Sequence, residues 1–260
     1  MSGSSHALQY RRSVADAGWS ALAVVTPDDT LLRDPRLRVS PEGAALLTWH
    51  GYSPPTFEEG LHATWLHPER WVDATLALYE YNYARCAVAL AVDGGAIAAW
   101  ALPSPQGVQT ANFSAGAWNR MPSVEQDGGA RGTRPTVDLD LVGMATLRWL
   151  SFEQQTDRVW TARSAGAGWG APALLDEAGN APTFLAQESN GRGEALVAWL
   201  HGPSMVVLRT DGSADVVDTI EGLILRDREP PTLAMGPSGA KWILANADEP
   251  GWRAVAMFCR

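Results

Sequence analysis

The stretch LLRDPRLRVSPEGAALLTWHGYS, residues 31–53, contains the pattern that decides the fold of this 260-residue chain. Its central part, GAALLTW, runs from Gly43 to Trp49 with five mostly small and apolar residues between them. A short apolar run that begins at a glycine turn is typical of a buried β-strand. A shorter alternating segment precedes the Pro41-Glu42-Gly43 turn, so the stretch predicts two strands joined by a tight turn.

The same unit, a glycine and a tryptophan six positions later, recurs at steps of 51, 49, 50 and 46 residues. Its copies are Gly43–Trp49, Gly94–Trp100, Gly143–Trp149, Gly193–Trp199 and Gly239–Ala245, the last with its tryptophan early, at Trp242. A second series interleaves with the first, at Trp19, Trp71, Trp118 and Trp169. Each unit of about 50 residues therefore contains four short strands, which is typical of one β-propeller blade.

We predict an all-β fold, a five-bladed β-propeller of four-stranded antiparallel blades, with a six-bladed propeller as the alternative. The prediction treats residues 1–260 as one domain, with blades at about 35–82, 86–128, 134–179, 181–223, and 230–260 plus 7–26. The last blade is built from both chain ends, because a closed ring leaves no edge strand open. A β-sandwich with accidental spacing is the competing interpretation. The first tryptophan series is expected to fill the space between neighbouring blades.

Composition and charge exclude several classes of function. The net charge of −9 and the pI near 5.0 provide no basic surface for nucleic acid or an anionic membrane. No apolar run approaches the roughly 20 residues that span a bilayer. The N-terminus has no apolar core of signal-peptide length, so we do not expect Sec export of the chain as given. The chain is thus expected in the cytoplasm as it stands, or outside the cell if a leader has been removed. Cys86 and Cys259 suggest two buried thiols or a single clasp, and no metal or cofactor motif is present.

The run YRRSVADAGWSALAVVTPDDTLLRDPRLRVSPEGAALL resembles the sialidase-like propellers, whose blades carry a recurring Asp-box turn. Ser13, Asp16, Gly18 and Trp19 match that box with shifted spacing, and the later turns SAGAW and SAGAGW lack its aspartate. The resemblance implies a glycosidase-type or lectin-type propeller. It also implies a cluster of three arginines that holds the carboxylate of a substrate.

Several charged residues stand just before the expected first strand of a blade, where the resemblance places a ligand at the mouth of the central channel. Guanidinium groups match carboxylate geometry, and paired carboxylates serve glycoside hydrolysis. The ligand-binding candidates are Arg33, Asp34, Arg134, Arg228 and Glu229, and the catalytic candidates are Asp34, Glu229 and Asp138, with Asp140 as an alternative to Asp138. Arginines beside turns are also ordinary surface residues in a chain with a single lysine, and Asp34 is also suited to capping its own turn.

His50 and His201 follow the tryptophans of two different blades and are further ligand-binding candidates, although both positions also suit loop-edge residues. A retaining sialidase needs a tyrosine nucleophile with a glutamate partner. The run LYEYNY, residues 78–83, offers these residues, but at the expected outer edge of a blade. We therefore favour a non-catalytic module that binds a glycan, a small polar ligand or a protein partner. A glycoside hydrolase is the alternative.

Overall fold

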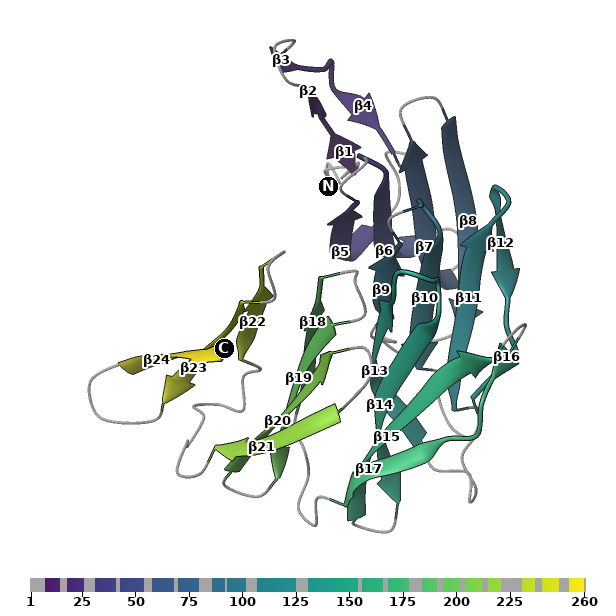
Figure 1. Ribbon diagram of the computed structural model, residues 1–260. Coiled ribbons are helices and arrows are strands. Elements are labelled where there is room, and N and C mark those ends of the chain that lie inside the picture. Colours follow the sequence, from purple (N-terminus) through teal and green to yellow (C-terminus); the bar gives the residue numbers. More distant parts are fainter. Residues whose placement is uncertain are drawn as a thin grey trace, which may run out of the picture. The chain divides into compact units, whose positions relative to one another are not determined.

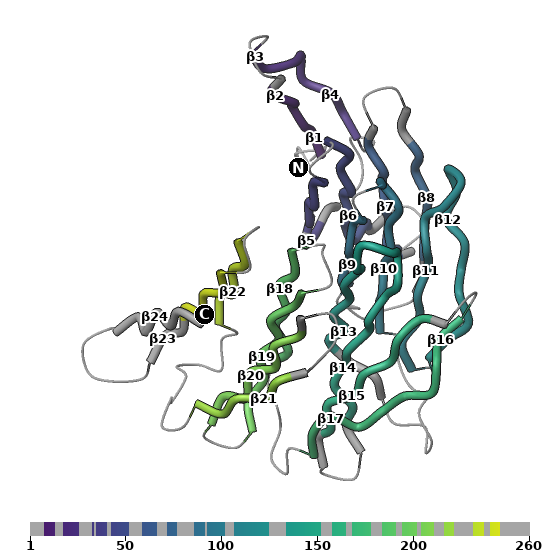
Figure 2. Tube along the Cα trace, viewed as in Figure 1, coloured from purple at the N-terminus to yellow at the C-terminus, as the bar shows by residue number. Residues whose placement is uncertain are grey.

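The computed structural model describes residues 8–14, 18–25, 31–40, 43–53, 58–67, 70–79, 86–91, 93–101, 107–124, 131–153, 156–165, 168–177, 184–190, 194–201, 204–211, 215–220, 231–236, 240–247 and 253–259. Figure 1 shows their strands, and Figure 2 traces the chain with the remaining residues in grey. The chain divides into two compact units, Met1–Tyr83 and Ala84–Arg260. All regular structure among the described residues is β-strand, as the sequence predicts.

The first unit contains one four-stranded antiparallel sheet and two small strand pairs. The sheet has the order β5 (Leu31–Val39), β6 (Ala45–Ser53), β7 (Glu58–His67) and β8 (Arg70–Tyr79). The small pairs join β1 (Gln9–Tyr10) to β4 (Ala23–Val24), and β2 (Ser13–Val14) to β3 (Gly18–Trp19). Residues 8–25, within the segment 7–26 that the sequence assigns to the last blade, thus contain two short strand pairs.

The second unit contains four larger antiparallel sheets in chain order. The second sheet of the chain comprises β9 (Cys86–Leu90), β10 (Ala96–Ala101), β11 (Val108–Ser114) and β12 (Ala117–Arg120). The third comprises β13 (Arg131–Leu139), β14 (Ala145–Glu153), β15 (Thr156–Ala165), β16 (Gly168–Trp169) and β17 (Ala173–Glu177). The fourth comprises β18 (Leu185–Ser189), β19 (Glu194–His201), β20 (Ser204–Asp211) and β21 (Asp215–Ile220), and the fifth β22 (Thr232–Met235), β23 (Lys241–Ala247) and β24 (Arg253–Cys259).

The first strands of the second unit lie next to one another, since β13 contacts both β9 and β18, and β18 contacts β22. Four-stranded antiparallel sheets that meet through their first strands are the arrangement of a β-propeller. The predicted fold class is therefore confirmed. The choice between five and six blades, the blade boundaries and the blade shared by both chain ends stay predictions.

The recurring glycine closes the same hairpin turn in the first three sheets. In the first, the Ser40 N–H donates to the carbonyl of Ala44, and the Gly43 N–H donates to the carbonyl of Ser40. The same two bonds link Ala91, Gly94 and Gly95 in the second sheet, and Asp140, Gly143 and Met144 in the third. The turn places Gly43, Gly94 and Gly143 at φ values of 85°, 83° and 79°. Because glycine adopts this left-handed conformation without a Cβ clash, the spacing of glycines reports the spacing of turns.

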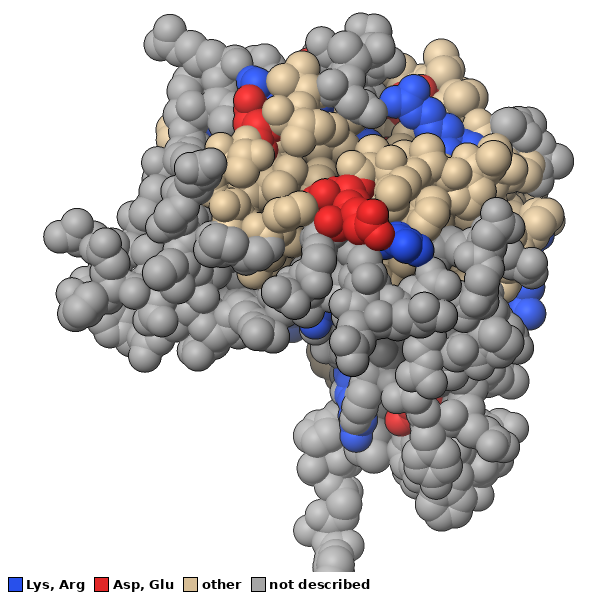
Figure 3. All heavy atoms as spheres, turned by 90° about the horizontal axis from the view of Figure 1, so that it is seen from below, with Lys and Arg blue, Asp and Glu red and all other residues tan. Residues whose placement is uncertain are grey.

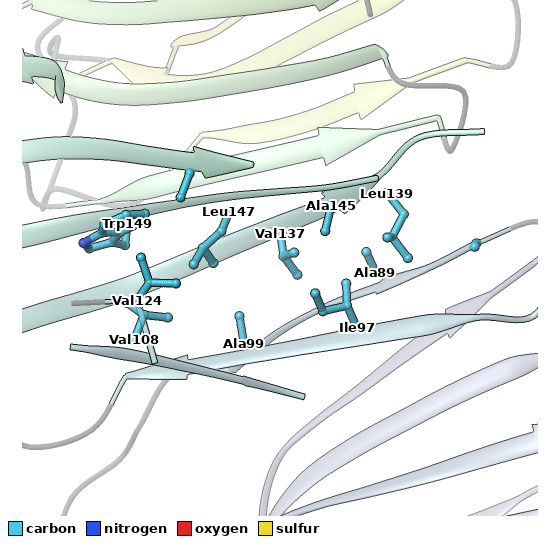
Figure 4. Close-up of a cluster of buried hydrophobic side chains, with 12 residues drawn as sticks. Ala89, Ile97, Ala99, Val108, Val124, Val137, Leu139, Ala145, Leu147 and Trp149 are labelled. Carbon is cyan, nitrogen blue, oxygen red and sulfur yellow. The ribbon is translucent and has the colours of Figure 1, made fainter. Parts of the chain in front are cut away.

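The first tryptophan series forms the core, as predicted. Trp49, Trp100, Trp149 and Trp199 are all at most 6% exposed. Trp149 belongs to a cluster in which Val137 and Leu147 of the third sheet pack against Ile97 and Ala99 of the second (Figure 4). The opposite face of the third sheet packs Leu150 and Val159 against the fourth sheet. Trp242, displaced by three positions, is 49% exposed.

The second tryptophan series is less buried. Trp19 is 70% exposed, whereas Trp118 and Trp169 are half-buried. Trp169 Nε1 donates to Thr110 Oγ1 at 2.9 Å and so links the third sheet to the second. This link assigns Trp169 a structural role.

Candidate functional site

The structure places most of the predicted site residues on strands. Arg33 is exposed on β5, which also contains Asp34, and His50 is buried on β6. Arg134 and Asp138 lie on β13, and His201 ends β19. The side chain of Asp34 and the whole of Arg228 and Glu229 lie outside the described residues. The cluster of three arginines and the pairing of Asp34 with Glu229 therefore stay predictions.

The proline-containing segments beside two of the candidate arginines, Arg33 and Arg134, are bulges inside strands. The register of β5 against β6 shifts between Arg33 and Arg36, and that of β13 against β14 shifts between Thr133 and Thr136. Proline has no N–H to donate, so the ladder skips the segment that contains it. The sequence suggested that Pro35 begins the first strand, whereas β5 begins at Leu31. Arg134 adopts a φ of 48°, a left-handed conformation that costs a non-glycine residue about 1–2 kcal/mol.

A buried ion pair lies between the first two strands of the third sheet. Arg148 Nη1 donates to Asp138 Oδ2 at 3.1 Å. Arg148 is 2% exposed and Asp138 is 8% exposed. Taking two charges out of water is costly unless they pair and their remaining polar atoms are satisfied. Among the described residues of the third sheet, this pair therefore depends most on having its charges paired and its polar atoms hydrogen-bonded.

The ion pair extends to the next sheet through Gln187 on β18. Arg148 Nη1 also donates to Gln187 Oε1 at 3.2 Å. We call Thr136, Asp138, Arg148 and Gln187 the inner polar cluster. Thr136 stands opposite Arg148 in the register of β13 and β14. Asp138, Thr136 and Gln187 come from the neighbouring first strands β13 and β18, so the cluster lies on the first-strand side of the two sheets.

Three buried atoms of the inner polar cluster have no hydrogen-bond partner: Arg148 Nε, Gln187 Nε2 and Thr136 Oγ1. Leaving a buried donor unpaired costs roughly 1–3 kcal/mol, and more for a charged group. The inner polar cluster thus contains three unsatisfied polar atoms between the third and fourth sheets.

A second polar link joins the same two sheets at β17, beside the apolar cluster that contains Trp199. Trp199 Nε1 donates to Asp176 Oδ2 at 2.7 Å, and His201 Nδ1 lies 3.0 Å from the same oxygen. Trp199 is buried, whereas His201 is exposed. The structure thus explains His201 as a partner of Asp176 in a link between sheets.

The first unit contains a separate histidine cluster. The rings of Trp49 and His62 stack with centroids 5.4 Å apart, and His62 Nδ1 lies 3.3 Å from Thr75 Oγ1. Burial, and secondly the charge of His50, lower the pKa of His62 below its usual value of 6.5. His50 thus contributes to the lowered pKa of His62, a neighbouring histidine within the first sheet.

We expect the first unit to lose stability below pH 6.5. Because the pKa of His62 is lower in the folded chain, the unfolded chain binds more protons as the pH falls through 6.5 towards the folded pKa. The stabilisation by neutral His62 is complete above 6.5 and is lost on acidification. Urea denaturation at about pH 7.5 and about pH 5.5 should show a smaller loss in His62→Gln than in the parent. His201→Gln, on an exposed strand end, is the control; an equal loss in all three proteins would contradict the prediction.

The charged side chains of one face form several small groups. Figure 3 shows, on one face, small groups in which acidic and basic side chains lie next to one another, with uncharged residues between the groups. Within the described ranges, no three histidine, cysteine or acidic side chains gather as metal ligands. The same ranges contain no helix long and apolar enough to cross a membrane.

Sequence reasoning identified Asp138 and missed Arg148 and Gln187. One signal for Arg148 was available: it stands in MATLR, at a position occupied by Thr48, Ala99 and Ala198 in three other copies of the Gly-to-Trp unit. An arginine in a strand of small residues indicates a buried charge that needs a partner. Nothing local points to Gln187, which is 39 residues away in the chain.

No protein-family model matches the chain, and no curated protein matches its sequence. Solved structures are similar to it in fold. A protein of unknown function from Dyadobacter fermentans has a TM-score of 0.59 at 14% identity, over 97% of this chain and 82% of its own. The α-L-arabinofuranosidase Arb93A of Fusarium graminearum has 0.53 at 10% identity, over 97% and 86%. The Hadza microbial sialidase Hz136 has 0.51 at 12%, over 83% and 53%. At these identities the likeness concerns the fold alone, and the chain has the fold of a sialidase-like β-propeller.

Proposed function

We propose that the protein is a non-catalytic β-propeller module that binds a carbohydrate or another polar ligand. The observation that supports this most directly is the ion pair of Asp138 with the fully buried Arg148. Asp138 accepts a hydrogen bond from the guanidinium and holds it in place, whereas a glycosidase acid must carry a proton to the leaving group. The names of the similar structures, an arabinofuranosidase and a sialidase, make a carbohydrate the leading ligand class.

The alternative is a glycoside hydrolase. It is supported by the names of the same two similar structures and by the carboxylates predicted at the starts of blades. It requires a pair of carboxyl groups on either side of a sugar, or a tyrosine nucleophile beside a glutamate. Tyr79, the first tyrosine of the LYEYNY run, is the last residue of β8, an edge strand of its sheet. β8 lies at the opposite edge of the sheet from the first strand, β5.

A glycan array combined with a panel of fluorogenic glycosides tests the proposal. We expect binding to at least one class of glycan and no turnover above that of a buffer blank. Turnover on any glycoside that disappears in Asp34→Asn or Glu229→Gln would establish the hydrolase instead. An empty array, with protein shown to be folded by circular dichroism, would reject carbohydrate binding.

A further inference from the structure

We infer that Trp19 is the residue on which the proposed carbohydrate stacks, and that the sugar has one ring face from which no hydroxyl group projects. This inference rests on the proposed function and names a contact residue and a ligand class. The indole of Trp19 is 70% exposed. Tryptophan is highly buried on average in folded proteins, so an indole this exposed is unusual. A ligand in solvent reaches the ring directly.

Two other tryptophans of the second series have partners that Trp19 lacks. The ring centroid of Trp118 lies 5.4 Å from that of Phe113, and Trp169 Nε1 donates to Thr110 Oγ1 at 2.9 Å. Within the described residues, the side chain of Trp19 makes neither a ring contact nor a hydrogen bond. Trp19 thus occupies the same place in the repeat without the packing role, and its indole is open to a ligand.

The backbone around Trp19 is hydrogen-bonded on both sides of the residue. Trp19 pairs with Ser13 in the β2–β3 ladder. Directly after it, the Ser20 N–H donates to the carbonyl of Arg12 at 2.8 Å, and Ser20 Oγ accepts from the Arg12 N–H at 3.0 Å. Directly before it, Gly18 adopts a φ of 72°, and a Cβ there would meet no atom within 4 Å. A ring held on a paired backbone beside open space loses little freedom on binding, which favours affinity.

The surroundings of the indole favour a sugar over a purely apolar partner. Its neighbours in the strand pair, Ser13, Gly18 and Ser20, are exposed, and the two serines are polar. The face of an aromatic ring carries partial negative charge, which attracts the partly positive C–H groups of a sugar. A pyranose with one hydroxyl-free face places those C–H groups on the indole and keeps its hydroxyl groups in water. A β-galactoside has such a face, whereas the open-chain polyol galactitol has hydroxyl groups but no fixed face.

Isothermal titration calorimetry with methyl β-D-galactopyranoside and D-galactitol tests the inference. We expect the galactoside to bind the parent protein, and galactitol to bind at least about tenfold more weakly because it has no fixed face to stack. The affinity for the galactoside should fall by about tenfold or more in Trp19→Ala, since the stacking surface is removed. It should fall by less than about threefold in Trp19→Tyr, which keeps an aromatic ring. Thermal melting should show both variants folded, because the substituted side chain is exposed.

Trp242→Ala and Leu22→Ala are the matched controls, because Trp242 is a 49% exposed tryptophan and Leu22 a 48% exposed apolar residue near Trp19 in the chain. Both should bind like the parent. Unchanged affinity in Trp19→Ala would place the sugar elsewhere and reject the inference while leaving carbohydrate binding intact. An equal loss in Leu22→Ala would indicate an apolar docking patch and overturn stacking on the ring, and equal affinity for galactitol would overturn the need for a ring face. Failure of the galactoside would also reject the inference, and only an empty glycan array beside it would reject the proposed function.

Discussion

Replacing Trp149 with alanine is expected to lower the free energy of unfolding by roughly 3–5 kcal/mol. The indole is fully buried and packs with Val137 and Leu147 in the apolar cluster between the second and third sheets (Figure 4). Its removal loses the transfer free energy of a large side chain and leaves a cavity that two paired sheets are poorly able to close. Urea denaturation followed by circular dichroism gives the change directly.

Trp19→Ala is the control for this measurement, because Trp19 is 70% exposed and an exposed substitution usually changes stability by less than about 0.5 kcal/mol. The difference between the two variants isolates burial from the loss of a tryptophan as such. A loss below about 1 kcal/mol for Trp149→Ala would contradict the assignment of this residue to the core.

Asp138→Ala is expected to destabilise the protein by a similar amount, roughly 3–5 kcal/mol. The substitution leaves the guanidinium of Arg148 buried between two sheets with only the neutral Gln187 as an acceptor among the contacts described. The cost comes from the uncompensated charge rather than from lost packing. The double variant Asp138→Ala/Arg148→Met should therefore recover much of the stability, because it removes the charge as well.

Asp218→Ala supplies the matched control for the ion pair. Asp218 Oδ2 lies 2.6 Å from Arg209 Nη2, but the Asp218 side chain is 50% exposed. Such a surface pair contributes about 0.2–1 kcal/mol at most, because water solvates both groups when they separate. Equal losses in Asp138→Ala and Asp218→Ala, or no recovery in the double variant, would show that burial does not set the cost of breaking the Asp138–Arg148 pair.

The fold was predictable because its determinants are local and repeated. Gly43, Gly94 and Gly143 are required by a left-handed turn, and the tryptophan six residues later always falls at the same place on the second strand. When a turn and a core position recur at a constant interval in a chain, that interval indicates how many residues form each repeated sheet. The burial of Trp100 and Trp149 followed from the same regularity.

The site was less predictable because its determinants are neither local nor repeated. The bulge at Thr133–Thr136 depends on how β13 pairs with β14, which proline alone did not reveal. The partnership of Arg148 with Gln187 depends on which faces of two sheets meet. The sequence identifies Asp138 as a carboxylate on a first strand. Only its contact with Arg148 favours a role in binding the guanidinium over a role as a proton donor.

The uniform hairpin turn has a practical consequence for engineering. Its two backbone hydrogen bonds and its glycine determine the geometry, so the residues at each tip are free to vary; in the third sheet they are Leu141 and Val142. The tip in the third sheet presents both of its side chains to solvent, with Leu141 65% and Val142 81% exposed. Such a tip is an attachment point at which a foreign peptide or a chemical label can be displayed on a rigid two-stranded support without altering the sheet beneath it.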